Sequence, residues 1–363
     1  MKSFVGIGKG DLQRAVDEAV KEIGTPKGII FMTDYKRLAQ VAEILHNRFP
    51  NVPSIGTVGT SFACGQVSDS HLVVIAFYED AKLSFGVLEE ISECPIAEIK
   101  KVEESLNAVG AQRKDTVCLQ YCTGAEEKLV TTLQTVLGKK QIQLIGGTVF
   151  GVPEGKPLQV AYQGKVYEDA SVYAMIRNTT GKINVYKENI YQKRPEAKGH
   201  IATRVDVSRR ALIELDGKSV ADVYSSEIGI SKSEIMDNVF FNPMGRVVGN
   251  EVFIASIKSM DSQGSFLNYK RINKNDCLYF LELGDYKQIE EETRKQIKEE
   301  MSHISLIISI DCAYRYLLYT QNGFIGTYAK EMARLGKHAG IIGGGEQYNK
   351  QHVNQTMVCA VFE

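Results

Sequence analysis

One short pattern occurs three times in this chain and restricts the folds open to it. Each copy consists of an apolar strand, a helix, a turn rich in isoleucine and glycine, a polar segment and a second apolar strand. The three turns read Ile55-Gly56-Thr57, Ile145-Gly146-Gly147-Thr148 and Ile342-Gly343-Gly344-Gly345-Glu346. Strands that alternate with helices through glycine turns are typical of α/β folds. We therefore expect related substructures built on mixed β-sheets with flanking helices.

Length and charge limit the classes of protein that remain. A chain of 363 residues is long enough for two domains, and the polar, basic stretch 178–200 is the expected boundary, with domains over 1–195 and 196–363. The formal net charge of −1 gives no overall field that favours nucleic acid or anionic lipid. The N-terminus lacks the apolar core of a signal peptide, and no apolar run approaches the ~18 residues of a membrane span. We expect a cytoplasmic protein without membrane insertion.

Two local patterns give further expectations. The apolar run from Leu72 to Tyr78 predicts a strand, and the run from Lys82 to Leu88 is expected to pair with it as a hairpin. The seven cysteines are odd in number and scattered, which favours reduced, buried thiols over a disulfide framework. Cys118 and Cys122 lack the two further clustered ligands that a zinc site needs.

The last of the three glycine turns leads into a loop that concentrates polar side chains. Three consecutive glycines allow the backbone to approach a neighbour or a ligand closely. Glu, His, Tyr and two Asn follow within eleven residues, which makes residues 346–356 a candidate ligand-facing edge. Asn354 and Thr356 begin the closing strand, where side-chain hydrogen bonds to the loop are the alternative to ligand contacts.

A second candidate lies where the strand ending near Ile310 gives way to a helix, because open α/β sheets bind ligands at such positions. Arg315 is expected to pair either with a ligand carboxylate or internally with Asp311 or Glu346. Arg315 and Glu346 together would complement the two charged ends of an amino acid. Cys312 beside them is a further candidate.

The second half of the chain resembles the C-terminal part of the FIST (F-box and intracellular signal transduction) sensory domain. The resemblance rests on Ser309-Ile310-Asp311-Cys312-Ala313-Tyr314-Arg315, on Gly344-Gly345-Glu346-Gln347-Tyr348 and on His352-Val353-Asn354-Gln355-Thr356. The glycine loops of the first half look like the matching N-terminal part. The resemblance implies two mixed-sheet halves, FIST N and FIST C, for which an αββα layering is one arrangement. It also implies a bacterial sensory module that binds a small ligand, such as an amino acid or related metabolite. Because no output module fits after the two halves, the signal is expected to pass to a separate partner protein.

These observations define the expected ligand site and its alternatives. A haem-binding nitric-oxide sensor remains an alternative, although the chain has no Cys-x-x-Cys-His attachment, and we expect no cofactor. An enzyme acting on a small metabolite is a second alternative, although none of the common catalytic motifs occurs. We predict no metal and no catalytic residues. The predicted ligand-binding residues are Cys312, Arg315, Gly344, Gly345, Glu346, Tyr348, Asn354, Thr356, Gly146, Gly147 and Thr148.

Overall fold

The computed structural model describes residues 1–249 and 251–363, which form two compact units. Each unit is assembled from stretches that are distant in the sequence. A division of the chain into domains at residue 195 stays a prediction. Unit 1 comprises Met1–Lys187, Thr293–His352 and Met357–Glu363, and unit 2 comprises Glu188–Glu292 and Val353–Thr356.

Unit 1 is built on three repeats, and in each of them one or two helices join a pair of parallel strands. The strands of each pair are almost entirely buried, which fits their apolar sequences. This confirms the α/β class and the threefold pattern. The repeats are β2 (Gly28–Thr33), α2 (Leu38–Arg48) and β3 (Ser54–Val58); β8 (Thr116–Cys122), α4 (Glu126–Lys140) and β9 (Gln143–Thr148); and β23 (Leu306–Cys312), α8 (Ala313–Gln321), α9 (Ile325–Leu335) and β24 (His338–Gly343).

Each parallel pair is the centre of a six-stranded sheet, and the three sheets have equivalent strand orders. On one side, each pair is joined by an antiparallel strand that follows later in its own repeat: β6 (Leu72–Phe77), β12 (Ser171–Asn178) or β27 (Thr356–Phe362). Beyond it lies an outer strand: β1 (Ser3–Gly8), β7 (Ala81–Leu88) or β13 (Ile183–Asn189). We number the sheets containing β2, β8 and β23 as first, second and third.

The other side of each parallel pair is completed by a hairpin from a different repeat. The hairpin after β3 joins the third sheet, the one after β9 joins the first, and the one after β24 joins the second. The repeats therefore exchange hairpins in a cycle. The hairpins are β4 (Ser61–Ala63) with β5 (Gln66–Ser68), β10 (Val160–Tyr162) with β11 (Lys165–Tyr167), and β25 (Glu346–Tyr348) with β26 (Gln351–Val353).

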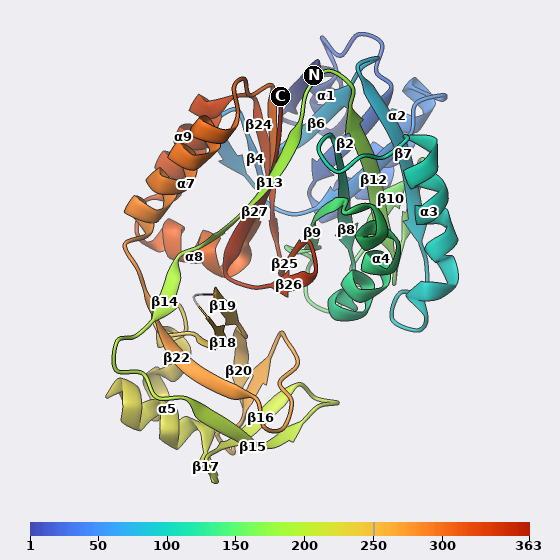
Figure 1. Ribbon diagram of the computed structural model, residues 1–363. Coiled ribbons are helices and arrows are strands. Elements are labelled where there is room, and N and C mark those ends of the chain that lie inside the picture. The colour runs from blue at the N-terminus through green and yellow to red at the C-terminus, as the bar shows by residue number, and fades with distance from the viewer. Residues whose placement is uncertain (250) are drawn as a thin grey trace. The chain divides into compact units, whose positions relative to one another are not determined.

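The outer strands are also exchanged in a cycle, in the opposite direction to the hairpins, and the chain ends close that cycle. β7 leaves β6 to join the second sheet, and β13 leaves β12 to join the third. The ammonium group of Met1 donates a hydrogen bond to the backbone oxygen of Glu363, so β1 begins where β27 ends (Figure 1). The hairpin expected between Leu72 and Leu88 is wrong for this reason. Both edges of β6 are already hydrogen-bonded, to β1 and β2, so β7 pairs with β12 instead.

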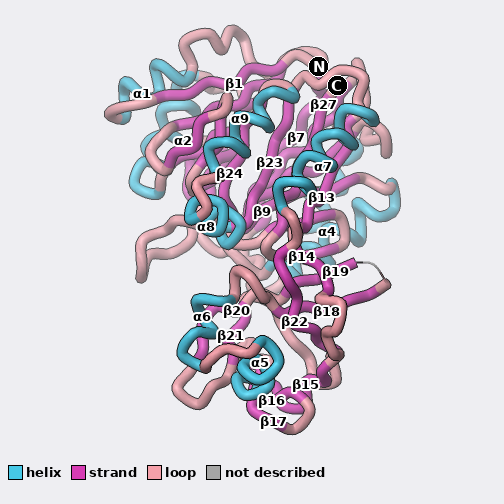
Figure 2. The backbone as a smooth tube through the Cα atoms, turned by 90° about the vertical axis from the view of Figure 1, so that its left-hand side faces the viewer, coloured by secondary structure: helices cyan, strands magenta, loops and turns pink. Residues whose placement is uncertain are grey.

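Helices cover the outer faces of these sheets. Leucines of α4 and the apolar side of α3 (Ile99–Ala108) pack on β8, β9 and β12 in one buried cluster. Figure 2 shows α8 and α9 beside β23 and β24. α1 (Leu12–Ala19), which Asp11 caps, lies against β1.

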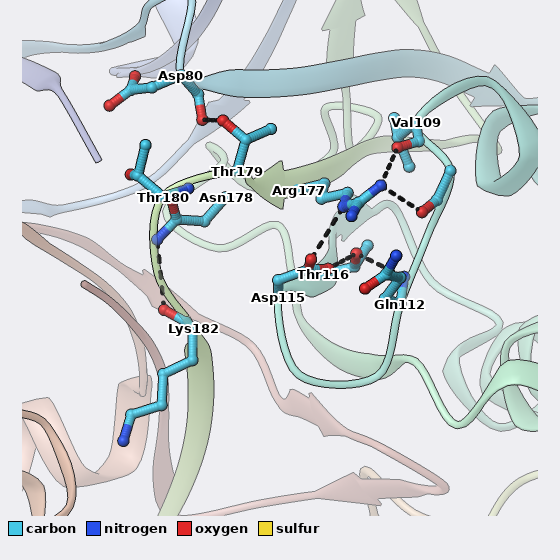
Figure 3. Close-up of polar contacts among 11 residues, drawn as sticks. Asp80, Val109, Gln112, Asp115, Thr116, Arg177, Asn178, Thr179, Thr180 and Lys182 are labelled. Atoms are coloured by element: carbon cyan, nitrogen blue, oxygen red, sulfur yellow. Dashed lines mark hydrogen bonds and ion pairs between the residues drawn. The ribbon is translucent and has the colours of Figure 1, made fainter.

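The carboxyl end of β12 is fixed by side-chain contacts to the start of β8. Figure 3 shows Arg177 donating to the carboxylate of Asp115 at 2.9 Å and to the backbone oxygen of Val109 at 3.4 Å. Asp115 also accepts the hydroxyl of Thr116 at 2.8 Å. These contacts hold the junction from which β12 continues toward β13.

Unit 2 is an antiparallel sheet with α5 (Val220–Ile228) packed against it. Tyr224 of α5 contacts Phe266 and Phe280 edge-on, with ring centroids 5.8 and 4.9 Å apart. A short α6 (Ile235–Asn238) adds Ile235 to the same core. α7 (Tyr286–Glu300) connects the two units along the chain. The strands are β14 (Tyr191–Lys193), β15 (His200–Asp206), β16 (Ala211–Leu215), β17 (Lys218–Ser219), β18 (Met244–Val248), β19 (Glu251–Ile254), β20 (Ile257–Met260), β21 (Phe266–Asn268) and β22 (Cys277–Leu283).

Candidate functional site

The structure brings the two predicted glycine segments together in unit 1. β25 crosses from the third repeat and pairs with β9, so that Glu346 lies opposite Gly147. The turn before β25 is held by two backbone hydrogen bonds. Gly344 N–H donates to the Thr148 carbonyl at 2.8 Å, and Thr148 N–H donates to the Gly345 carbonyl at 3.0 Å. The carboxyl ends of β9 and β24 therefore meet, which is where parallel sheets bind ligands.

Close packing leaves no room for a side chain at Gly147 and crowds one at Gly146. A Cβ atom on Gly147 would lie 2.6 Å from Cγ2 of Ile310, and one on Gly146 would lie 2.5 Å from Nε2 of Gln120. Gly345 has φ +147°, a conformation that L side chains rarely adopt. These glycines therefore allow neighbouring strands of the chain itself to approach one another closely.

Arg315 forms an internal ion pair with Asp311, one of the two internal partners considered from the sequence. Nε of Arg315 lies 3.3 Å from Oδ1 of Asp311, and the two side chains are 0% and 2% exposed. The guanidinium carbon lies 4.9 Å from the ring centroid of Tyr319 and 5.2 Å from that of Tyr328, within reach of cation–π attraction. Tyr328 also donates its hydroxyl to both oxygens of Asp311, at 2.9 and 3.1 Å. Asp311 and the two tyrosines thus surround the guanidinium.

The other predicted residues lie along the same strand ends and the loop that follows. Cys312 is the buried N-cap residue of α8, and Glu346 is fully buried. The backbone oxygen of Glu346 lies 3.2 Å from Nδ1 of His352. The ammonium group of Lys187 lies 5.6 Å from the ring centroid of Tyr348. Asn354, which lies between β26 and β27, and Thr356, the first residue of β27, are both buried and belong to unit 2.

Sequence reasoning missed a buried polar network in the second sheet. Nε2 of Gln120 donates to Oε1 of Gln347 at 2.6 Å, and Nε2 of Gln347 donates to the hydroxyl of Thr148 at 3.3 Å. Thr148 in turn donates to Glu126 at 3.1 Å, and Ser171 donates to Oε1 of Gln120 at 2.7 Å. The signal was present, because Gln120 interrupts the otherwise apolar run of β8. From the sequence, Thr148 was a candidate by itself and Gln347 only as part of the segment 346–356; the contacts that join them were not predicted.

Cys122 ends β8 beside this network. Its Sγ lies 3.7 Å from the Thr148 hydroxyl, and burial raises the pKa of the thiol to about 12. Burial likewise raises the pKa of Cys118 to about 12. Both thiols are therefore protonated at neutral pH. None of the seven cysteines, all of which lie in the described ranges, is in a disulfide, but Cys64, Cys94 and Cys277 are exposed, so the expectation of buried thiols holds for four of them.

Replacing Gln347 by leucine is expected to lower the free energy of unfolding by about 1–3 kcal/mol, because the buried amide of Gln120 and hydroxyl of Thr148 each lose a partner. Urea unfolding followed by far-UV circular dichroism measures the change. Additional replacement of Gln120 by leucine should cost less than the sum of the two single changes, since the pair is then removed together. Strict additivity would show that the two amides do not interact.

Two negative findings concern the described part of the chain. No group of three His, Cys, Asp or Glu side chains there is arranged to hold a metal ion. Among the same residues, no helix combines the length and apolar character needed to span a bilayer.

Comparison with known proteins identifies the family. A search of curated proteins gave no match. Among solved structures, phosphoribosylformylglycinamidine synthase II from Thermotoga maritima aligns with 99% of this chain and 71% of its own, at 8% identity and a TM-score of 0.20, which is too low to carry an argument. The FIST N domain matches residues 27–218 and the FIST C domain matches residues 221–349. The chain belongs to the FIST family of sensory signal-transduction domains, as the motifs of its second half imply.

Proposed function

We propose that this chain is a sensor that binds a small ligand, an amino acid or related metabolite, and signals to a separate partner protein. Membership of a family of sensory domains supports the general role. The observation that carries the location is the pairing of β25 with β9, which puts Glu346 opposite Gly147 at the carboxyl ends of two parallel pairs. The proposed ligand-binding residues are Cys312, Arg315, Gly344, Gly345, Glu346, Tyr348, Asn354, Thr356, Gly146, Gly147 and Thr148.

The ion pair between Arg315 and Asp311 suggests how binding and signalling are coupled. In the described state, Asp311 faces the guanidinium, as a ligand carboxylate would. We propose that this is the closed, ligand-free state and that the ligand carboxylate replaces Asp311 on Arg315. Glu346 would then accept the ligand ammonium group. The ligand shifts the equilibrium toward the open state only by its higher affinity for that state.

A thermal-shift screen of the purified chain against the twenty common amino acids tests the proposal. A ligand at about 100 times its Kd should add about 2.7 kcal/mol to the free energy of unfolding, which is a visible shift. Calorimetry then compares variants on the compound found. Asp311→Asn keeps the shape of the side chain but weakens the competing charge, so it should bind more tightly, whereas Arg315→Met should not bind.

Lys232→Met is the control, because Lys232 pairs with Asp222 in unit 2 and belongs to neither the site nor its strands. It should bind like the unchanged protein. A screen without any shift, or unaltered binding in Arg315→Met, contradicts the proposed site. An absorbance scan of the same sample tests the alternative of a haem sensor. A Soret band would show that the chain binds haem and would favour haem over an amino acid as the ligand.

A further inference from the structure

Unit 2 contains a histidine held between two carboxylates that come from different segments. Nδ1 of His200, the first residue of β15, lies 2.6 Å from Oδ2 of Asp216. Nε2 of the same ring lies 2.6 Å from Oε2 of Glu227. Asp216 occupies the turn between β16 and β17, and Glu227 lies in the last turn of α5. We call these three residues the histidine clamp.

The geometry of the clamp fixes the charge of the ring. A carboxylate oxygen only accepts hydrogen bonds, so both ring nitrogens must donate, and only the doubly protonated imidazolium can do so. A neutral imidazole would turn a nitrogen lone pair toward one of the carboxylates at 2.6 Å. Burial lowers the pKa of His200, but the hydrogen bonds to Glu227 and Asp216 outweigh burial, and the pKa is raised above its ordinary value.

Each carboxylate of the clamp makes one further contact. Asp216 has a left-handed backbone, with φ +51°, and its Oδ1 accepts the backbone N–H of Ile201 at 2.8 Å. Oε1 of Glu227 lies 3.6 Å from the guanidinium of Arg194. The clamp therefore joins the start of β15, the turn after β16 and the end of α5.

The clamp also forms part of a cavity wall and touches the core of unit 2. The ring of His200 lies 5.5 Å from that of Phe280, which in turn packs on Tyr224 of α5. A movement of α5 would thus change both the cavity and the aromatic core. The cavity has a volume of about 570 Å³, and its lining includes the three clamp residues together with Lys198, Lys218 and Asp222.

We propose that unit 2 senses protons: the clamp is closed while His200 carries its second proton, and loss of that proton releases the end of α5 and reshapes the cavity. A proton would then be a second input to this chain, and the inference holds whether or not a small ligand binds in unit 1. Because the pKa of His200 is raised in the folded state, the clamp contributes its full stabilisation below about pH 6.5, the ordinary histidine value. That contribution is lost as pH rises through the raised folded pKa, so the release occurs on the neutral-to-alkaline side.

The charged or titratable groups around the clamp come from several elements. The segment leading into β15 supplies Arg194, Glu196 and Lys198, the turn after β16 supplies Asp216 and Lys218, α5 supplies Asp222 and Glu227, and β22, which pairs with β15, supplies Cys277. Carboxylates ordinarily titrate below pH 5, and lysine and arginine above pH 9. The exposed thiol of Cys277 is replaced by serine in the test so that it cannot contribute.

Hydrogen exchange of the full chain carrying Cys277→Ser tests the proposal. Exchange is followed by mass spectrometry between pH 6 and 9 and corrected for the intrinsic pH dependence of amide exchange. Peptides covering residues 213–229 should lose protection at least tenfold across this range, while α4 of unit 1 should not. Proton NMR of the six histidine rings, with His200 assigned by its absence from His200→Gln, should place its midpoint above pH 6.5.

Variants distinguish release of the clamp from a general loss of hydrogen-exchange protection at alkaline pH. His200→Gln cannot take up a proton, so the transition should vanish. Glu227→Gln keeps the shape but removes one carboxylate, so the midpoint should fall toward the ordinary histidine value; it also tests the proposal if His200→Gln fails to fold. His303→Gln, an exposed histidine in unit 1, is the control and should keep the transition. A midpoint for His200 at or below pH 6.5, or a transition that persists in His200→Gln, would overturn the proposal.

Discussion

Replacing Asp311 by alanine is expected to lower the free energy of unfolding by about 3–5 kcal/mol, which is much of the stability of an ordinary domain. The reason is that the guanidinium of Arg315 is completely buried and Asp311 is its ion-pair partner at 3.3 Å. Removing the carboxylate leaves the desolvated positive charge without that partner and also removes the acceptor of the Tyr328 hydroxyl. Thermal and urea unfolding of the purified variant measure the loss.

An exposed ion pair with the same spacing provides the control. Arg14 and Glu18 also lie four residues apart, with side chains that are 67% and 38% exposed. Glu18→Ala should leave the melting temperature and the urea midpoint nearly unchanged, because water screens such pairs. The double variant Asp311→Asn with Arg315→Met should cost less than Asp311→Ala, since it removes both charges. A small loss in Asp311→Ala would show that the buried charge is compensated in another way.

Replacing Gly8 by alanine is expected to destabilise the protein by about 3 kcal/mol or more, at the upper end of the effects seen for overpacking. A Cβ atom at this position would lie 1.7 Å from the backbone oxygen of Ala15, and β1 would have to separate from α1. No rotation of a side chain can relieve a clash with backbone. A fall in the melting temperature, with selective loss of hydrogen-exchange protection in α1, is the expected signature.

Gly326 is the matched glycine for comparison. It lies in the first turn of α9, and a Cβ atom there would meet nothing within 4 Å. Gly326→Ala should leave the stability unchanged or raise it by up to about 1 kcal/mol, because alanine favours the helix. If Gly8→Ala were equally harmless, the close approach of β1 to α1 would be wrong.

The sequence was sufficient to predict the repeats but insufficient to predict how they interlock. Buried strands such as β6 can be recognised from their continuous apolar runs, and the glycine turns marked the ends of others. The exchanged hairpins consist of three-residue strands such as β4 and β25. Each hairpin pairs with the unpaired edge of a sheet in another repeat. The local sequence of the hairpin does not indicate which edge that is. The wrong prediction that β7 pairs with β6 has the same cause, because β7 joins the sheet of another repeat.

For the candidate site too, the sequence indicated segments but not the contacts between distant residues. Both glycine turns were named as candidate segments from the sequence, and their similarity reflects equivalent places in the sheets, but the pairing of Gly147 with Glu346 was not predicted. The contact between Gln347 and Gln120 was missed because the two residues are 227 positions apart. His200 and Glu227 are 27 residues apart and come together only when α5 packs on the sheet. Polar contacts of this kind depend on tertiary packing, so local secondary-structure propensity does not predict them.

The exchange of hairpins has a consequence during synthesis. The hairpin β4–β5 is made early, yet the strand that receives it, β24, begins at His338. At about 5–20 residues per second, the ribosome needs some tens of seconds to cover that interval. The edge of β9 likewise stays open until β25 has been made. Nascent chains therefore carry unpaired strand edges, which are prone to pair with other chains. Newly made copies of this protein depend on dilution or on chaperones until their last thirty or so residues emerge.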